Sequence, residues 1–363
     1  MQMKLLRKTG RWIGRILSGI IVLAICLVGI VRLGNYLTYH ISTAGGVDEG
    51  IYVELNGQQQ FIRVRGENVN NPVIIWLHGG PASPDGFVDY VWEKDLVDQY
   101  TIITWDQRGC GRTYFRNQAN DPDNETATFE QAVQDVDALV DYVERRFAPK
   151  DIVIVGHSYG TMVGSKYALE HPDRIRAYIG VGQVVTMESE LYSYEDALQK
   201  AKAQGDDTAA MEEAFRNYAE DTNLINMQTA RQLAAPYHKA EREKNTIWQG
   251  VKSSFMGIDD LRWFLKQMGD IGTYFALNGQ LFDYILTADV REYGMTYELP
   301  VGFITGESDW TTPAAYSEDY CEQITAPDKR YELISGCGHS PQFDAPEEFA
   351  ETLGEMLQAY LQK

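Results

Sequence analysis

An α/β fold, with a mostly parallel sheet covered by helices on both faces, is predicted by two features of the 363-residue sequence. Short apolar runs rich in β-branched residues end repeatedly in glycine or a polar residue, as buried parallel strands do. Amphipathic helical stretches lie between these runs. One long region of helical runs without a strand interrupts the alternation, so we expect a helical insertion in the core.

The expected strands follow one another along most of the chain. Asn56-Gly57, between two β-rich runs in IYVELNGQQQFIRVRG, predicts a hairpin ahead of the buried strands. The buried runs are PVIIWLHGG (72–80), YTIITWDQRG (100–109), DIVIVGHS (151–158), RIRAYIGVG (174–182), LPVGFITGES (299–308) and KRYELISGCG (329–338).

The helical stretches carry their own start signals. TFEQAVQDVDALVDYVERRF shows an apolar face, and Thr128 with Gln131 predicts a capping box at its start. The C-terminal PEEFAETLGEMLQAYLQK has the same amphipathic pattern. Residues 184–296 hold runs such as SYEDALQKAKAQ, AAMEEAFRNYAE and IDDLRWFLKQMGDI. We expect this insertion to lie over the C-terminal ends of the strands, where such sheets bind ligands.

These patterns divide the chain into four segments. Residues 1–45 are predicted to be a membrane anchor and linker, and 46–183 the first part of the core. Residues 184–296 are predicted to form a helical cap, and 297–363 the second part of the core. The stretch ISTAGGVDEG (41–50), which spans the first of these boundaries, has the composition of a linker.

The first 40 residues differ in charge from the rest. They hold six basic residues and no acidic one, namely Lys4, Arg7, Lys8, Arg11, Arg15 and Arg32. The whole chain carries a formal net charge of −20, so removing those six leaves −26 for the remainder. The charge-free run ILSGIIVLAICLVGIV between Arg15 and Arg32 approaches the roughly 20 residues that cross a bilayer. Arginines at its two ends can extend to the interfaces.

Two interpretations of this run remain open, an anchor and a cleaved signal peptide. No small-x-small cleavage pattern follows it, which favours an uncleaved anchor. The preceding basic residues indicate a cytoplasmic N-terminus by the positive-inside rule. The sequence therefore predicts a single-pass protein of the cell membrane with an extracytoplasmic catalytic domain. The acidic remainder argues against a nucleic-acid partner.

The four cysteines do not make a disulfide framework. Cys26 lies in the apolar run, and Cys110, Cys321 and Cys337 form neither a CxxC pair nor a metal-ligand spacing. We expect buried or free thiols and no metal site. A bridge between Cys110 and Cys337 stays open as an alternative.

The stretch DIVIVGHSYGTMVG (151–164) places Ser158 between a strand and a helix. A serine at this point is by itself an ordinary helix N-cap. Glycines on both sides, in Gly156-His157-Ser158-Tyr159-Gly160, instead indicate a nucleophile elbow, where neighbouring side chains would clash. We therefore predict that Ser158 is a nucleophile.

A serine nucleophile needs a base and a carboxylate to orient that base. Of the six histidines, His339 follows the last expected strand, where a loop can carry an imidazole back over the sheet. Asp309 follows the preceding strand, and we prefer it to Glu307, which we expect to be solvated or locally hydrogen-bonded. The chain order Ser158, Asp309, His339 is that of an α/β-hydrolase triad.

A tetrahedral intermediate needs two N–H donors. One is expected from Tyr159, the residue after the nucleophile, and the other from the HGGP loop at 78–81. Gly80 is the preferred second donor, because a Cβ there would obstruct the approach of substrate to the backbone. A tight turn without a catalytic role is the alternative for this loop.

The segments HGGP, WDQRGCGRT, GHSYG, GESDW and GCGHSP together resemble the proline iminopeptidase family over residues 50–363. These are serine aminopeptidases of the α/β-hydrolase fold with a helical cap. The resemblance implies the triad and oxyanion donors named above, no cofactor, and release of N-terminal residues from short peptides. It also implies that Asp106, Gln107 and Arg108 are structural, and an Arg and an Asp so placed are expected to form a buried ion pair.

Two positions depart from the residues usual in this family. Ala82 stands where glycine is usual, and Tyr159 where tryptophan is usual. Both are expected beside the acyl or amine pocket, so the preferred N-terminal residue stays open.

In this family acidic residues of the cap hold the free amine of the substrate. GQVVTMESELYSYEDAL, at the start of the insertion, offers Glu188, Glu190 and Glu195, of which Glu190 is preferred. The aromatics Tyr192, Tyr194, Trp248, Trp263 and Phe264 could line an apolar pocket, but packing within the cap explains each of them equally well.

The sequence thus predicts a membrane-anchored serine hydrolase, acting as an aminopeptidase on short peptides. A carboxylesterase or lipase with this core and another cap is the alternative within the same class. A non-catalytic receptor, whose cap closes on a ligand, is the alternative from another class. A dehalogenase is excluded because the elbow residue is serine and not aspartate. The oligomeric state stays open.

Overall fold

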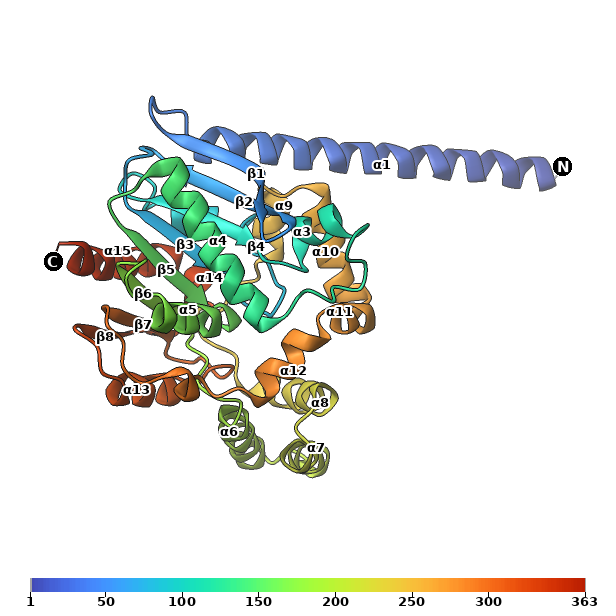
Figure 1. Cartoon of the computed structure of the whole chain (residues 1–363). Helices are drawn as coiled ribbons and strands as arrows, with labels where there is room; N and C mark the ends of the chain where they lie inside the picture. Colours follow the sequence, from blue (N-terminus) through green and yellow to red (C-terminus); the bar gives the residue numbers. More distant parts are fainter. Residues whose placement is uncertain (1, 363) are drawn as a thin grey trace.

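The computed structural model describes residues 2–362, with side chains described for Trp12 and from Arg15 onward. These residues form an eight-stranded sheet in the order β1-β2-β4-β3-β5-β6-β7-β8 (Figure 1). The pairs β1-β2 and β2-β4 are antiparallel, and all pairs from β4 to β8 are parallel. The predicted α/β fold with a mostly parallel sheet is confirmed.

Every strand expected from the sequence is present. The strands are β1 (Val47–Leu55), β2 (Gln58–Gly66), β3 (Val73–Leu77), β4 (Thr101–Asp106), β5 (Ile152–His157), β6 (Ala177–Val181), β7 (Val301–Gly306) and β8 (Lys329–Ile334). Asn56 and Gly57 both have positive φ and close the predicted hairpin, in which Leu55 pairs with Gln58. Because β1 begins at Val47, the connection from the N-terminal helix is shorter than the predicted linker 41–50.

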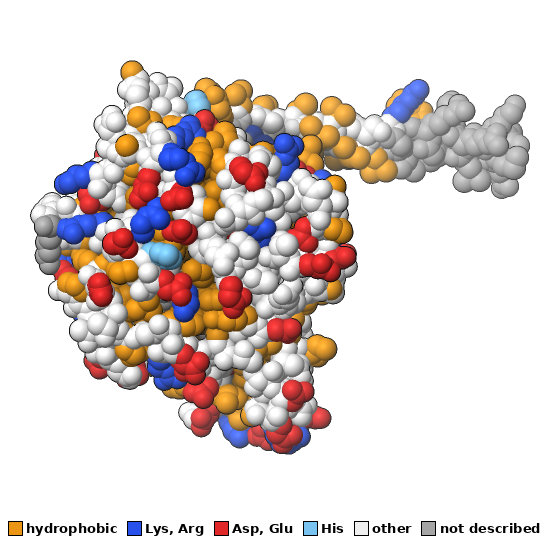
Figure 2. Space-filling model, viewed as in Figure 1, with side chains coloured by type: hydrophobic (Ala, Val, Ile, Leu, Met, Phe, Trp, Pro, Cys, Tyr) orange, Lys and Arg blue, Asp and Glu red, His pale blue; other side chains and the backbone are white. Residues whose placement is uncertain are grey.

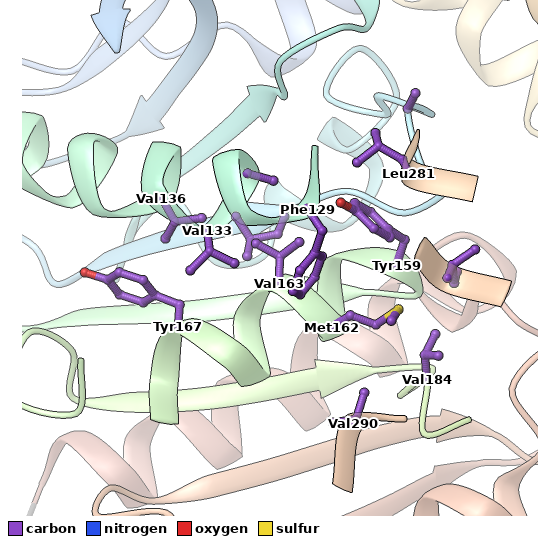
Figure 3. Packing of buried hydrophobic residues seen from close by; sticks show 14 of the residues in the cluster. Phe129, Val133, Val136, Tyr159, Met162, Val163, Tyr167, Val184, Leu281 and Val290 are labelled. Atoms are coloured by element: carbon purple, nitrogen blue, oxygen red, sulfur yellow. The ribbon is translucent and has the colours of Figure 1, made fainter. Parts of the chain in front are cut away.

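Helices cover both faces of the sheet. Those of the core are α2 (Tyr90–Glu93), α3 (Gly111–Asn117), α4 (Phe129–Phe147), α5 (Tyr159–Glu170), α13 (Ala314–Gln323), α14 (Pro341–Asp344) and α15 (Pro346–Leu361). Side chains of α4 and α5 pack together on one face, as Figure 3 shows for Val133, Val136 and Val163. Side chains of α2 and α15 pack on the other face.

The predicted start of α4 is only partly correct. Thr128 Oγ1 accepts a hydrogen bond from Gln131 N at 3.1 Å, as a capping serine or threonine does. The Gln131 side chain, however, donates to Asp135 Oδ1, and Thr128 N donates to Thr126 O. The reciprocal half of the expected capping box is therefore missing, because nearer partners satisfy both groups.

The insertion between β6 and β7 is helical, as expected. It contains α6 (Ser189–Gln204), α7 (Ala209–Glu220), α8 (Leu224–Ala234), α9 (Ile247–Lys252), α10 (Ile258–Gly269), α11 (Ile271–Leu277) and α12 (Gly279–Thr287), with short 3₁₀ turns at Ala235–Tyr237 and Val290–Tyr293. Residues 182–300 are all described. They contain no strand, and their β structure is limited to isolated bridges, one of them between Thr186 and Asp289. The division of the chain at 184–296 into a separate cap domain stays a prediction.

The N-terminal helix α1 (Gln2–Tyr39) projects from the body (Figure 1). Its part from Arg15 to Tyr39 is long and apolar enough to cross a membrane. Its last turns are docked on the insertion, since Arg32 donates to Val251 O at 3.3 Å and to Met256 O at 3.0 Å. The expectation that Arg32 extends toward a bilayer interface stays a prediction, and its guanidinium is held by backbone carbonyls of the insertion.

Candidate active site

Ser158 lies in a sharp turn between β5 and α5 with φ 51° and ψ −122°. A Cβ at Gly156 would lie 2.4 Å from Gly160 O, and one at Gly160 would lie 2.1 Å from Leu77 O. The turn therefore requires both glycines, as an elbow that exposes a nucleophile does. The Ser158 side chain makes no helix-capping hydrogen bond, so the alternative of an ordinary N-cap does not describe it.

The structure brings the three predicted triad residues together from separate loops. His339 Nε2 lies 2.9 Å from Ser158 Oγ, and His339 Nδ1 lies 2.9 Å from Asp309 Oδ2. Because an ionised carboxylate can only accept, Asp309 fixes the imidazole proton on Nδ1 and leaves the Nε2 lone pair facing the serine. This arrangement can draw a proton from Ser158 when the hydroxyl attacks a carbonyl carbon.

Asp309 is buried, and its surroundings keep it ionised. Its oxygens accept hydrogen bonds from Thr311 N, Thr312 N and Thr312 Oγ1 in addition to His339. Burial raises the pKa of Asp309, but His339 and the Thr312 hydrogen bonds outweigh it, so the pKa lies below its usual value. Glu307 instead accepts from Ser335 Oγ and Gly336 N, as expected for the carboxylate not preferred.

The HGGP loop passes close to the elbow. A Cβ at Gly79 would lie 2.9 Å from Ser158 Cβ, and Gly80 has φ +118°, where side chains are rarely tolerated. Gly80 and Ser158 line a common cavity of about 50 Å³. Tyr159 begins α5 immediately after Ser158. The two candidate oxyanion donors therefore come from separate segments: Gly80 from the HGGP loop and Tyr159 from the elbow itself.

Three side chains of the insertion hold this loop. Trp263 Nε1 donates to Ala82 O at 2.9 Å, Gln267 Nε2 donates to the same oxygen at 3.2 Å, and Tyr274 hydroxyl donates to Pro81 O at 2.6 Å. The sequence offered Trp263 only as a pocket or packing residue, and the role of Gln267 and Tyr274 was missed. One signal in the sequence could have indicated such a contact: a buried tryptophan needs an acceptor for its indole N–H.

The side chains at the two family departures, Ala82 and Tyr159, are buried. The Tyr159 ring packs against Phe129 under α4, with ring centroids 6.4 Å apart (Figure 3). Ala82 is buried, and its carbonyl is taken up by Trp263 and Gln267. Neither residue is among the described residues that line the cavity beside Ser158, and the expectation that both lie beside an acyl or amine pocket stays a prediction.

The segment 106–113 supports the HGGP loop, but Asp106 and Arg108 do not form the expected ion pair. Arg108 binds Asp135 in α4, with distances of 2.7 and 2.9 Å from Nε and Nη2 to the two carboxylate oxygens. Asp106 Oδ2 accepts from Arg112 N at 2.8 Å. The expected pairing of Asp106 with Arg108 is wrong, because α4 supplies a buried carboxylate in the reach of Arg108.

Two further contacts join this segment to the end of β3. Gln107 Nε2 donates to His78 O at 3.1 Å, and Gln107 N donates to His78 Nε2 at 3.3 Å. Burial lowers the pKa of His78 to about 4, so the ring is neutral and can accept this hydrogen bond. The segment therefore has the structural position that the resemblance implies.

The candidate amine-binding glutamates are dispersed. Glu190 is fully buried and accepts from Arg231 Nε at 3.1 and 3.0 Å, with a further contact from Arg231 Nη2. Glu188 and Glu195 are exposed and do not line the cavity beside Ser158. The role of Glu190 in binding an amine stays a prediction, and its charge is already paired with Arg231.

The cavity beside Ser158 is mostly apolar. The described residues that line it are Gly80, Pro81, Ser158, Val184, Met187, Ser189, Met227, Arg231, Phe282, Ile285, Thr311 and Thr312. Arg231 alone among them carries a charge. A molecule bound in this cavity would therefore meet the positive charge of Arg231, which is paired with Glu190.

The cysteines give no covalent link. All four are described and all are free, so the alternative of a bridge between Cys110 and Cys337 is wrong. Cys110 Sγ lies 3.4 Å from His78 Nε2 in the interior. Within the described part of the chain, no group of three or more His, Cys, Asp or Glu residues is placed to hold a metal ion.

Comparison with known proteins agrees with the fold. A family model described as alpha/beta hydrolase fold matches residues 72–346. The chain is 23% identical over 316 residues to the probable aminopeptidase YbaC of Bacillus subtilis, covering 85% of this chain and 96% of that protein. It is 23% identical over 320 residues to the proline iminopeptidase of Lactobacillus delbrueckii subsp. lactis, covering 84% of this chain and 97% of that protein.

Solved structures share the fold at lower identity. The proline iminopeptidase of Mycobacterium smegmatis has a TM-score of 0.62 and 20% identity, covering 86% of this chain and 98% of that chain. A structure described as a membrane phospholipase A, a bacterial virulence factor, has a TM-score of 0.60 and 15% identity, covering 96% of this chain and 99% of that chain. Structures at such identities show the fold alone.

Proposed function

The chain belongs to the alpha/beta hydrolase family, and from this premise we propose that it is a serine hydrolase with Ser158 as nucleophile. The observation that carries the proposal is the pair of 2.9 Å contacts that link Ser158, His339 and Asp309. The strained backbone of Ser158 supports it, because such strain is retained where the surrounding structure exposes a reactive group.

In the proposed mechanism Ser158 Oγ attacks the substrate carbonyl while His339 Nε2 takes its proton. The N–H groups of Tyr159 and Gly80 stabilise the oxyanion of the tetrahedral intermediate. His339 then returns the proton to the leaving group, and a water molecule repeats the sequence to release the acyl group from Ser158. Every step uses groups of this chain and water, so the mechanism needs no cofactor.

For the substrate we propose a short peptide with a free N-terminus. Support comes from relatives named as aminopeptidase and proline iminopeptidase, whose length this chain matches almost completely at 23% identity. Glu190 would attract the substrate amine only if it retained charge unshared with Arg231. Glu188 and Glu195 are the remaining candidates at the start of α6.

A carboxylesterase or lipase activity is the second candidate, and one observation favours it. No carboxylate is among the described residues that line the cavity beside Ser158, and its apolar side chains suit an acyl chain. A substrate without a free amine would meet no unfavourable group there.

We also propose that α1 is an uncleaved membrane anchor with the N-terminus in the cytoplasm and the catalytic domain outside. Asn35 Oδ1 accepts from Ser254 N and Oγ at 2.9 and 2.8 Å, and Arg32 binds two carbonyls of the insertion. Cleavage on the C-terminal side of Asn35 would remove these contacts with the folded body. A signal sequence remains the alternative interpretation of the same helix.

The test is a substrate panel for the full chain in detergent. It should contain N-terminal prolyl and alanyl amides, the same amides with the amine acetylated, and short-chain acyl esters, with Ser158→Ala as control. Amide cleavage that acetylation abolishes is the expected result for an aminopeptidase. Cleavage of esters alone would replace the peptidase proposal with the esterase one, and no turnover that depends on Ser158 would contradict both.

A further inference from the structure

We propose that the outer face of α9, α10 and α11 rests on the lipid bilayer that α1 enters. The inference rests on the proposed anchor but goes beyond it, because an anchor alone does not determine which face of the body meets the membrane.

The outer face of α10 is apolar. Its exposed residues Ile258, Leu261, Leu265 and Met268 are spaced by three, four and three positions and therefore share one face. Ile258 is 79% exposed and Met268 68% exposed. On the opposite face of α10 lies Trp263, which is also apolar but buried. A helix on the surface of a globular protein normally presents polar residues to water, so this outer stripe needs a partner.

The apolar surface continues onto the two neighbouring helices. Ile247 and Trp248 of α9 and Ile271 of α11 are exposed as well. Ile247 and Leu261 line one cavity of about 200 Å³, together with Phe87 and Phe264. We call the residues Ile247, Trp248, Ile258, Leu261, Leu265, Met268 and Ile271 the apolar face. Since α9 and α10 share this cavity wall, the stripe of α10 and the exposed residues of α9 form one surface.

The length of α1 places the bilayer against this surface. The charge-free run from residue 16 to residue 31 holds 16 residues, which span about 24 Å as a helix. The hydrocarbon core of a bilayer is about 30 Å thick. The first residue after the run, Arg32, is already bonded to Val251 O and Met256 O. The bilayer boundary therefore cannot lie far from α9.

The direction of α1 agrees with this placement. Figure 1 shows that α1 leaves the body on the side where α9, α10 and α11 lie, and its protruding part presents hydrophobic side chains in Figure 2. The side chain of Trp248 has Lys252 Nζ 5.3 Å from its ring centroid. Tryptophan and lysine are typical of the boundary between lipid and water. Lipid is therefore the partner that the surroundings of the apolar face favour over a second copy of this chain.

The same helices reach the candidate oxyanion loop from their inner side. Trp263 and Gln267 of α10 bind Ala82 O, and Tyr274 of α11 binds Pro81 O. A surface resting on lipid is thus one helix thickness from the loop that carries Gly80. Contact with the bilayer would restrain the elements that hold this loop.

The test uses the full chain in phosphatidylcholine vesicles that contain lipids with a nitroxide on the acyl chain, placed near the headgroup end for labels at 265 and 225 and near the bilayer centre for the label at 23. An environment-sensitive fluorophore is attached to one introduced cysteine in a Cys26→Ser background, where the other three cysteines are buried. The labelled variants are Leu265→Cys on the apolar face, Leu23→Cys in the anchor and Ile225→Cys as a matched control. Ile225 is 76% exposed on α8, which lies far from α1 in Figure 1.

We expect strong quenching at positions 23 and 265 and several-fold less at 225. Quenching at 23 without quenching at 265 would overturn the docking and leave the anchor proposal intact. A label at 265 that is shielded from water but not quenched would indicate a second copy as the partner and would also overturn it. Loss of quenching at 23 would overturn the anchor, and the docking with it.

A second set of variants tests the surface itself. Ile258→Glu with Met268→Glu should reduce quenching at 265 while leaving quenching at 23 unchanged, because charges on this face oppose contact with lipid. Ile225→Glu, with a similarly exposed position, should change neither. Equal quenching at 265 in the charged and unaltered chains would contradict the proposal.

Discussion

The carboxyl ends of the parallel strands form the edge of the sheet that carries Ser158. This edge and the helical insertion are held in place by different means. At the edge, close approaches of backbone fix the loops, such as that between Gly160 and Leu77 O. In the insertion, ion pairs between distant segments fix the helices, such as those of Arg231 with Glu190 and Arg112 with Asp260. We infer that side-chain changes at the edge alter chemistry more than stability, whereas changes to the pairs of the insertion alter stability first.

The largest expected effect lies at the edge. Ser158→Ala and Asp309→Asn should each lower kcat by on the order of 10⁴-fold or more, because the nucleophile or the orientation of its base is lost. Glu307→Gln is the matched control, since among the described residues this exposed carboxylate accepts hydrogen bonds from Ser335 and Gly336, and its loss should leave kcat within about twofold. Thermal unfolding should be nearly the same for Ser158→Ala and Glu307→Gln. Equal losses of kcat in Asp309→Asn and Glu307→Gln would remove Asp309 from the triad.

The next effect lies in the insertion. Arg231→Met leaves Glu190 buried without its counterion, which should lower the free energy of unfolding by about 3–5 kcal/mol. Adding Glu190→Gln should restore much of this loss. Lys200→Met is the control on the same helix as Glu190, because its pair with Asp196 is exposed and worth at most about 1 kcal/mol. Urea denaturation measures all of these, and similar losses in Arg231→Met and Lys200→Met would contradict the comparison.

A smaller effect is expected in the dependence of stability on pH. Burial, reinforced by the neighbouring His339, lowers the pKa of His157 to about 3. Between about pH 6.5 and pH 3 the unfolded chain binds a proton there that the folded chain does not. The free energy of unfolding should therefore fall as the pH falls, by up to about 1.4 kcal/mol per pH unit from this group.

His157→Gln should remove that contribution, and urea denaturation from pH 8 to pH 4.5 would detect it as a shallower dependence than in the unaltered chain. Burial raises the pKa of Asp106 to about 7, which changes the slope in the opposite sense, so the useful quantity is the difference between the two chains. Identical slopes would mean that His157 titrates in the folded protein much as it does when unfolded.

The smallest effect is expected from reduction. Because Cys110, Cys321 and Cys337 are buried free thiols, neither region depends on a covalent link. Tm should be the same with and without dithiothreitol. A drop in Tm on reduction would show that a disulfide joins elements that the structure leaves unlinked.

The sequence predicted features that short stretches determine. The strands, the Asn56-Gly57 hairpin and the glycines around Ser158 depend on a few neighbouring residues, and the structure has them where expected. Glu307 and Asp309 could be distinguished because their loop positions follow from the end of β7.

Contacts between segments far apart in the chain could not be predicted in this way. Arg108 pairs with Asp135 and not with Asp106, and Glu190 meets Arg231 from a helix 41 residues away. The contact of Trp263 with Ala82 O spans 181 residues. Such partners depend on how helices pack across the sheet, which hydrophobic periodicity does not specify.

The docking of α1 has a consequence for the reach of the enzyme. A catalytic domain joined to its anchor by a flexible linker sweeps a volume that grows with linker length. Here α1, the proposed anchor, is bonded to the body through Arg32 and Asn35. With α1 in a bilayer as proposed, the cavity at Ser158 would be held at one height and one tilt, and its search for substrate would become two-dimensional. Molecules that dwell at the membrane surface would meet it often, and bulky molecules free in solution would seldom do so.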